Sequence, residues 1–235
     1  MRTSERRQLK QDKFAETTKD IISSAVEHRA PLVRSVLVGA VMVLVVGGAW
    51  WYWNYRTQRA NEAFAKAVET YNAPLLPPGS NSTTNNFHTA PERARAAHAQ
   101  FEEVAGHYGH TGPGQMARYL AGLTAIDAGD VKGGEADLQQ ASNSSDKELA
   151  ALAKLALANV YRGTNRSDEA LRLYRELMDH PTASVSKPAV ELELASLYAG
   201  TNQRAEASKV YDQILSSDPQ SAAAGVAQQR LQGLK

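Results

Sequence analysis

Histidine is the residue type of this chain whose spacing comes nearest to a metal site. His107 and His110 flank Tyr108 and Gly109 in a glycine-containing turn. No third ligand follows at a spacing that would complete a zinc site. Among the other histidines, His88, His98 and His180 are scattered along the chain. The sequence therefore predicts surface histidines and no metal ligand.

Motifs that carry catalysis are missing from the sequence. It contains no glycine-rich phosphate loop, no nucleophile elbow and no paired acidic motif. It also contains no cysteine, which excludes disulfides and cysteine-based zinc sites and is compatible with an oxidising compartment. We therefore expect no catalytic residue and no cofactor, and a function in binding rather than in chemistry.

One segment of the chain repeats at a constant offset, which predicts stacked helical hairpins. Small, aliphatic and aromatic residues recur in the same order 37 positions later, close to the period of roughly 34 residues that such hairpin arrays show. Arrays of this kind present surfaces for partners. The six matched pairs are Leu157 and Leu194, Ala158 and Ala195, Tyr161 and Tyr198, Ala170 and Ala207, Tyr174 and Tyr211, and Leu177 and Ile214.

Each copy predicts a pair of helices. The first helices are expected over 149–162 and 189–199, and the second helices over 165–178 and 202–215, because apolar residues fall at helical spacing there. An Ala- and Gln-rich capping helix is expected over 221–231.

The ends of these helices carry capping residues. Ser167 and Asp168 predict the N-cap of one second helix. Asp218 and Pro219 predict the N-cap and first position of the capping helix. A weaker, earlier copy aligns Gly122 with Ala158, but the glycines at 133 and 134 disfavour its second helix.

This pattern resembles the tetratricopeptide repeat over residues 115–219. The resemblance implies an all-α fold, an α-hairpin solenoid. The sequence departs at one position, where Arg118, Lys154 and Glu191 stand in place of the usual large apolar residue. The motif's turn, small, aromatic and proline positions are held by Gly129-Asp130, Ala170, Tyr174, Ala207, Tyr211 and Pro219.

An uncharged segment near the N-terminus predicts one transmembrane helix. The 18 residues of 36–53 are almost entirely apolar, and as a helix they span about 27 Å, close to the thickness of the hydrocarbon core. A cleaved signal peptide is less consistent with the sequence, because 34 residues precede the span. A buried core helix is less consistent as well, because the segment lacks a polar side. An interfacial aromatic belt is expected at the exit, formed by Trp50, Trp51, Tyr52, Trp53 and Tyr55.

Charge predicts the orientation of this span. Residues 1–34 hold eight Lys and Arg and five Asp and Glu, and such a basic bias places a flanking segment in the cytoplasm. The rest of the chain holds 18 basic and 20 acidic residues, and this near neutrality argues against a nucleic-acid partner. Residues 9–26 are either an amphipathic helix on the inner leaflet or, as we favour, a solvated tail.

Five segments follow from these patterns. We expect a basic cytoplasmic tail over 1–34, the transmembrane helix over 35–55, a helical stalk over 56–72, a flexible loop over 73–91 and the repeat domain with its capping helix over 92–235. The loop is rich in Pro, Ser, Thr and Asn. It is either a hinge between stalk and repeats or an excursion between two helices of the first hairpin.

The order of these features resembles the YfgM-type ancillary subunits of the bacterial Sec translocon, a tetratricopeptide family whose domain class includes the CpoB-type cell-division coordinators. The resemblance covers 36–219 and rests on the basic tail, the span, the aromatic exit, the stalk and segments such as 116–121 and 136–140. It implies a single-pass protein of the bacterial inner membrane with a periplasmic repeat domain. It also implies translocon subunits, periplasmic chaperones and exported polypeptides as partners.

A partner-binding groove is expected along the first helices of the hairpins, where tetratricopeptide domains bind extended peptides. Its residues are apolar near the membrane and mixed further on, and Met and Tyr adapt to varied partners. These side chains could instead pack against neighbouring helices. The expected groove residues are Met116, Tyr119, Leu123, Ile126, Leu152, Leu155, Asn159, Arg162, Leu192 and Ser196.

Two other functions remain open at the level of sequence. One is a cell-division or envelope-biogenesis coordinator that bridges cell-wall enzymes. The other is an anchoring or regulatory subunit of an enzyme on a separate chain.

Overall fold

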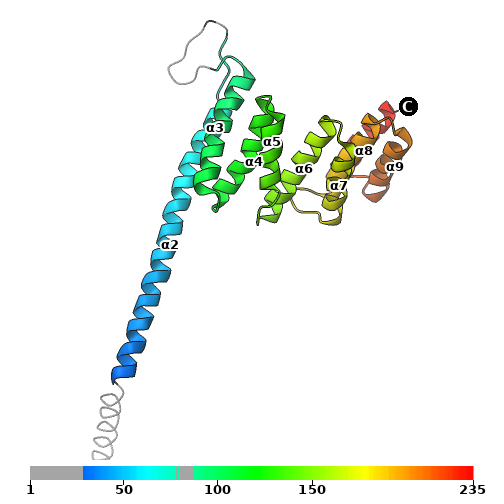
Figure 1. Cartoon of the computed structure of the whole chain (residues 1–235). Coiled ribbons are helices and arrows are strands. Elements are labelled where there is room, and N and C mark those ends of the chain that lie inside the picture. Colours follow the sequence, from blue (N-terminus) through cyan, green and yellow to red (C-terminus); the bar gives the residue numbers. More distant parts are fainter. Residues whose placement is uncertain (1–28, 78, 80–86, 235) are drawn as a thin grey trace, which may run out of the picture. The chain divides into compact units, whose positions relative to one another are not determined.

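The computed structural model describes residues 29–77, 79 and 87–234. Over these residues the chain is all-helical, as predicted, with helices α2 to α10 and no strand (Figure 1). The expected helix over 9–26 lies outside the described residues. The chain divides into two compact units, 1–55 and 56–235.

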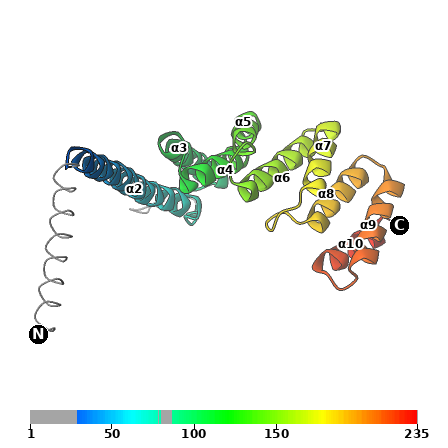
Figure 2. The same ribbon diagram turned by 90° about the horizontal axis from the view of Figure 1, so that it is seen from below.

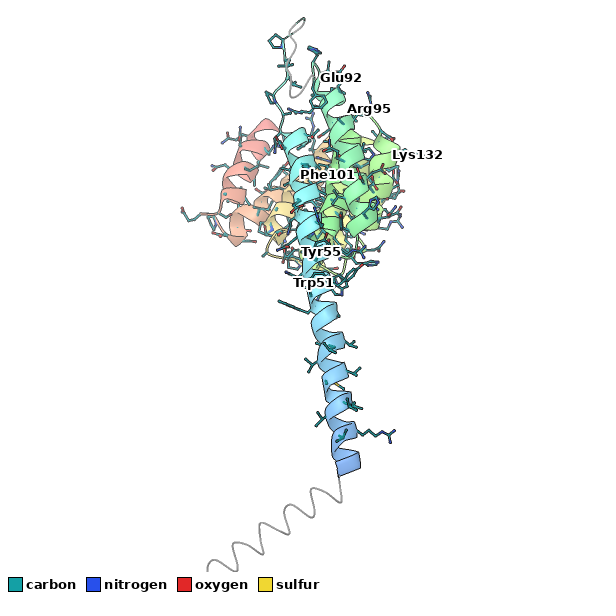
Figure 3. All side chains as sticks on the ribbon, turned by 90° about the vertical axis from the view of Figure 1, so that its left-hand side faces the viewer. Trp51, Tyr55, Glu92, Arg95, Phe101 and Lys132 are labelled. Atoms are coloured by element: carbon teal, nitrogen blue, oxygen red, sulfur yellow. The ribbon has the colours of Figure 1, made fainter. Side chains whose placement is uncertain are left out.

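Helix α2, Arg29–Tyr71, contains the apolar segment. It is the one helix of the described residues long and apolar enough to cross a membrane. Side chains from Val33 to Tyr55 are exposed. The rings of Trp51 and Tyr55, one helical turn apart, stack with centroids 5.9 Å apart (Figure 3). An apolar helix with every side exposed suits a lipid surrounding.

The second unit consists of antiparallel helices that pair in sequence order (Figures 1 and 2). Helix α4 pairs with α5, α6 with α7, and α8 with α9, and α10 packs against α8 and α9 at the end. Successive pairs contact through α5 and α6 and through α7 and α8. The helices are α3 Ala90–Tyr108, α4 Gly112–Asp127, α5 Val131–Ala141, α6 Lys147–Gly163, α7 Ser167–Asp179, α8 Lys187–Gly200, α9 Arg204–Ser217 and α10 Ala222–Gly233.

The part of α2 beyond residue 55 forms a hairpin with α3. Ala60 and Ala67 are fully buried. Phe64 of α2 packs against Phe101 of α3, with ring centroids 5.8 Å apart (Figure 3). The connection between the two helices is closed at its base by the Leu76 amide, which donates to the Phe87 carbonyl at 2.9 Å. Residues 56–71 are therefore packed in the same unit as the repeats.

Small residues stand where the helices of each hairpin cross. Ala158, Ala170, Ala195 and Ala207 are fully buried. In the earlier hairpin a Cβ atom on Gly122 would lie 2.7 Å from Leu138 Cγ and 3.1 Å from a carbonyl oxygen of α5. The two helices approach so closely there that only glycine fits, and the glycines do not prevent α5 from forming.

The turn inside each hairpin uses the left-handed backbone conformation. Asn165 and Asn202 have φ angles of 61° and 62°, and they stand 37 residues apart in the repeat. Gly129 occupies the corresponding turn of the earlier hairpin with φ of 92°. Gly and Asn adopt this region at the lowest cost, so one backbone turn is repeated three times.

Two expected N-caps are wrong. Arg166 is the N-cap residue of α7, without a side-chain cap bond, and Ser167 is the first residue of that helix. The N-cap of α10 is Ser221, whose side chain accepts from the Ala224 amide at 3.1 Å, while Asp218 is the C-cap of α9. The chain makes a further turn between Asp218 and α10. This turn places Ser221 at the N-cap of α10, where its side chain satisfies a free amide of the first helical turn.

Candidate functional site

The first helices of the hairpins contact one another in series. Helix α4 contacts α6, α6 contacts α8, and α8 contacts α10. All ten expected groove residues lie on α4, α6 and α8, and every one of them is half-buried. We call this set the inner face; its members are Met116, Tyr119, Leu123, Ile126, Leu152, Leu155, Asn159, Arg162, Leu192 and Ser196.

The α4 part of the inner face is apolar. Tyr119, Leu123 and Ile126 pack one side against the core that α5, α6 and α7 share. Burial raises the pKa of the Tyr119 phenol. Met116, nearer the start of α4, is half-buried as well. These side chains help to hold the hairpins together and still offer part of their surface to a partner.

The α6 part changes from apolar to polar along the helix. Leu152 and Leu155 pack against the same core. Asn159 accepts a hydrogen bond from the Tyr174 hydroxyl at 2.7 Å, and burial raises the pKa of Tyr174 to about 12. Arg162 forms an ion pair with Glu193 of α8 at 3.1 Å. The polar members of this face are therefore fixed in position by named partners.

A small polar cavity lies between α6 and α8. It measures about 340 Å³ and is lined in part by Asn159, Arg162 and Ser196. Ser196 donates to the Leu192 carbonyl at 2.9 Å and lies 3.5 Å from a guanidinium nitrogen of Arg230 on α10. The structure thus brings three inner-face residues together here, with hydrogen-bonding groups that could receive peptide N–H and C=O groups.

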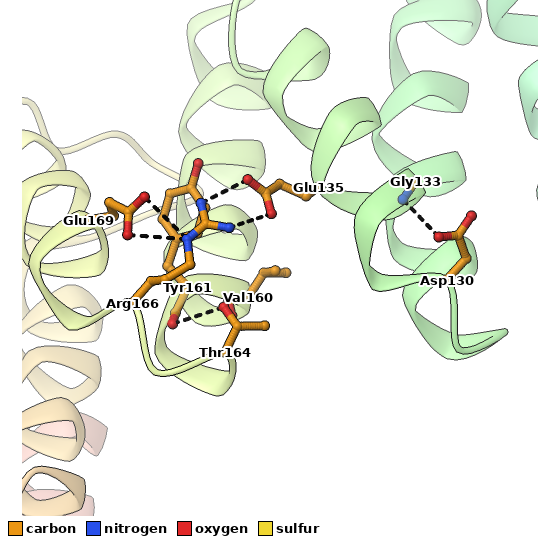
Figure 4. Close-up of polar contacts among 8 residues, drawn as sticks. All are labelled: Asp130, Gly133, Glu135, Val160, Tyr161, Thr164, Arg166 and Glu169. Carbon is orange, nitrogen blue, oxygen red and sulfur yellow. Dashed lines mark hydrogen bonds and ion pairs between the residues drawn. The ribbon is translucent and has the colours of Figure 1, made fainter.

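A cluster around Arg166 joins two hairpins and was not expected from the sequence (Figure 4). The guanidinium donates to both carboxylate oxygens of Glu135 on α5, at 2.7 and 2.8 Å, and to Glu169 at 3.2 Å. It also lies 4.0 Å from the centre of the Tyr161 ring. These bonds lower the pKa of Glu135. Such a fork-like pair fixes the register of neighbouring helices.

Another unexpected carboxylate, Glu148 at the start of α6, holds the connection between α7 and α8. Its oxygens accept from the Ala183 amide at 3.1 Å and from the Ser184 amide at 2.7 Å. These bonds lower the pKa of Glu148 to about 2. The sequence shows no signal for it, because the partners are 35 and 36 residues away and are backbone groups.

Among the described residues, one group could offer three metal ligands. His98, Glu102 and Asp137 place their ligand atoms within 4.8 Å of one another. Asp137 is engaged by Arg118 at 3.1 Å, so a metal ion would have to compete with a guanidinium. The sequence pair His107 and His110 is not part of this group; Nδ1 of His107 lies 3.0 Å from its own helix carbonyl at Glu103.

Comparison with known families decides the assignment of the helical array. The family described as a tetratricopeptide repeat-like domain matches residues 32–235. The chain belongs to the tetratricopeptide repeat-like family. No curated protein matches the chain. Tetratricopeptide repeat-like domains are generally non-catalytic scaffolds that mediate protein–protein interaction, so the inner face of this tetratricopeptide repeat-like chain is a candidate surface for a protein partner.

Proposed function

We propose that this chain is a single-span membrane scaffold that binds a protein partner along its inner face, outside the cytoplasm. The observation that carries the proposal is the half-buried state of all ten inner-face residues on three consecutive first helices. A packed core position would be closed to a partner, whereas these side chains are held in place and remain partly accessible.

The membrane part supports a tethering role. The apolar segment of α2 is exposed on all sides, and it ends in an aromatic belt, as a membrane span does. Attachment to the membrane raises the effective concentration of the inner face near other membrane proteins. A weak groove can then serve a nearby partner without high intrinsic affinity.

The chemistry of the inner face favours an extended or amphipathic protein segment. Its α4 end offers Tyr119, Leu123 and Ile126 for apolar side chains, and its α6–α8 end offers Asn159, Arg162 and Ser196 around a polar cavity. A segment with an apolar stretch followed by polar groups fits this order.

The partners that we propose come from the resemblance to YfgM-type subunits. They are translocon subunits, periplasmic chaperones and exported polypeptides, which places the repeat domain in the periplasm of a bacterium. The excess of basic residues before the span supports this orientation.

Site-specific photo-crosslinking in native membranes tests the proposal. A photoreactive residue at Leu123 or Arg162 probes the two ends of the inner face, and one at Arg175, exposed on α7, is the matched control. We expect adducts with translocon subunits, chaperones or exported chains from Leu123 and Arg162, and few from Arg175.

The other outcomes discriminate among the functions. Adducts confined to cell-wall or division proteins would contradict the translocon function and favour the function of a cell-division or envelope-biogenesis coordinator. Adducts with a single enzyme, in a complex whose activity the isolated chain lacks, would favour the anchoring subunit. Equal labelling from Arg175 and the inner face would contradict the binding face itself.

A further inference from the structure

Three side chains that can bind a metal ion come together from two helices beside α4. His98 and Glu102 stand four residues apart on α3, so they share one face of that helix. Asp137 reaches them from α5. One ligand atom from each of the three lies within 4.8 Å of the other two. None of the three belongs to the inner face, so the cluster is distinct from the proposed protein-binding surface.

A hydrogen bond to α4 fixes the tautomer of His98. Its Nδ1 lies 3.0 Å from the Ala121 carbonyl oxygen, and a carbonyl oxygen can only accept, so Nδ1 carries the proton. In the neutral ring the lone pair is then on Nε2, the nitrogen nearer to the Glu102 carboxylate. Histidines that bind a metal almost always donate their other ring N–H to a carbonyl or a carboxylate, which fixes the orientation of the ring. His98 is therefore held in the tautomer that a metal ligand needs.

The spacing of the two ligand atoms on α3 suits a shared metal ion better than a shared proton. Nε2 of His98 and Oε2 of Glu102 are 3.6 Å apart, which is too long for a hydrogen bond. A tetrahedral ion with bonds of about 2.0–2.2 Å to nitrogen and oxygen places neighbouring ligand atoms about 3.4 Å apart. A side-chain shift of at most about 1.4 Å brings Asp137 from the 4.8 Å limit to the same spacing.

The third ligand, Asp137, is held in place by Arg118 of α4. The Asp137 side chain is 7% exposed, and Arg118 donates to its Oδ1 at 3.1 Å. Among the described residues no other hydrogen bond reaches this carboxylate, so Oδ2 keeps its lone pairs for a metal ion. Carboxylates that bind a metal are commonly held by such an outer hydrogen bond. Arg118 and Ala121 are three residues apart on α4, so one turn of this helix positions two of the three ligands.

Charge and access favour a divalent cation at this cluster. Two carboxylates and the guanidinium of Arg118 leave a net negative charge when the imidazole is neutral. The Glu102 side chain is 52% exposed, so an ion can enter from solvent and water can complete its coordination. One imidazole nitrogen with two carboxylate oxygens suits Zn²⁺ and related transition-metal ions, whereas Mg²⁺ is bound through oxygen alone.

We propose that His98, Glu102 and Asp137 form a binding site for a divalent transition-metal ion, for which Zn²⁺ is the probe. The bound ion joins α3 to α5 across α4. It thereby links the hairpin that contains α3 to the hairpin of α4 and α5, and it stabilises the folded state in proportion to its occupancy.

Titration of the full chain with zinc tests the proposal. The chain is purified in detergent without a histidine tag, treated with a chelator and titrated with Zn²⁺ in a calorimeter. We expect one zinc ion per chain at this site. At a zinc concentration of 100 times the Kd, exchange of the most protected amides of 131–141 should slow by up to about 100-fold. Mg²⁺ at the same concentration should have no such effect, because it disfavours a nitrogen ligand.

Two matched pairs of variants locate the zinc ion. Glu102→Gln replaces the exposed ligand and should weaken zinc binding at least about tenfold, since loss of even an outer partner costs about 10- to 100-fold in affinity. Glu103→Gln makes the same change at the next residue, which is also exposed, and it should bind zinc like the parent. His98→Gln should lose the site as well, whereas His110→Gln changes an exposed histidine outside it and should keep it.

Three results would overturn the proposal. Equal zinc binding in the ligand variants and their controls would place the ion elsewhere on the chain. Equal effects of Zn²⁺ and Mg²⁺ would contradict a site with a nitrogen ligand. Absence of zinc binding would mean that His98 only joins α3 to α4 through its hydrogen bond. All three results leave the inner-face cross-links unaffected, so failure of this site is distinguishable from failure of the proposed function.

Discussion

At the scale of single residues, charged side chains of this domain hold backbone groups that no helix satisfies. Glu148 does so for two consecutive amides of the α7–α8 connection. The bonds favour the ionised carboxylate, which is why its pKa falls to about 2 from the ordinary value of 4.5. Because the folded pKa is lowered, the stabilisation is complete above pH 4.5 and is lost as the pH falls toward 2.

The first prediction concerns this tether. Glu148→Gln should speed amide exchange at Ala183 and Ser184 at neutral pH, because a neutral amide oxygen is a weaker acceptor than a carboxylate. In the parent chain, lowering the pH from about 4.5 to 2 should also reduce the protection of these two amides, after correction for the intrinsic pH dependence of exchange. Glu206→Gln, on the exposed first turn of α9, is the control. Unchanged protection in Glu148→Gln would show that the loop is ordered by other contacts.

The second prediction uses the close crossing of α4 and α5. Gly122→Ala should destabilise the domain by about 1–3 kcal/mol, since overpacking forces backbone or side chains apart. The new Cβ would meet Leu138 Cγ at 2.7 Å. Gly225→Ala in α10, where a Cβ meets nothing within 4 Å, should instead stabilise by about 0.4–1 kcal/mol. Urea unfolding measures the change in the free energy of unfolding for both variants. Changes of the same sign in both would contradict the prediction.

At the scale of elements, the Arg166 cluster couples consecutive hairpins. Its guanidinium starts from the turn before α7 and reaches Glu135 on α5 while lying over the Tyr161 ring. In a repeat array, stability is approximately the sum of each hairpin and its interfaces with its neighbours. A residue that bonds across an interface therefore adds to the coupling between the neighbouring hairpins.

The third prediction is that Arg166→Lys makes unfolding less cooperative. Lysine keeps the charge but loses the two-pronged bond and the flat contact with the tyrosine ring. In the variant, the amide exchange rates of α4 and α5 should differ from those of α6 to α9. Exchange should become faster than in the parent chain. Arg172→Lys, exposed on α7, is the matched control. Uniform exchange across the array in Arg166→Lys would mean that the apolar contacts alone provide the coupling.

The helices were more predictable than the contacts between them. The 37-residue repeat of Ala158 and Tyr161 predicts hairpins because small and aromatic residues alternate with helical spacing, and those positions are buried. Helix α5 forms in spite of its glycines, since packing against Gly122 offsets their low helix propensity. The pairing of Arg166 with Glu135 spans 31 residues and depends on the register of packed helices, which periodicity does not specify.

At the scale of the whole molecule, every tryptophan lies in the aromatic belt. The chain has three tryptophans, namely Trp50, Trp51 and Trp53, and they are exposed on α2. Intrinsic tryptophan fluorescence therefore reports on the belt alone. In bilayers, lipids brominated near the headgroup should quench it more strongly than lipids brominated at the chain ends, because indole rings prefer the interface. The reverse order would place the belt inside the hydrocarbon core and shift the span.

Topology provides the last prediction, and the lack of cysteine in the chain makes it simple to test. Ser4→Cys labels the basic tail, and Ser216→Cys labels an exposed position at the end of α9. In spheroplasts a membrane-impermeant maleimide should modify Ser216→Cys and spare Ser4→Cys until the membrane is opened with detergent. The physical reason for this expectation is the excess of basic residues before the span, because a basic flank favours the cytoplasmic side. Labelling of Ser4→Cys alone would indicate the opposite orientation, in which the inner face meets cytoplasmic partners. Labelling of both cysteines in intact spheroplasts would exclude a membrane-spanning α2.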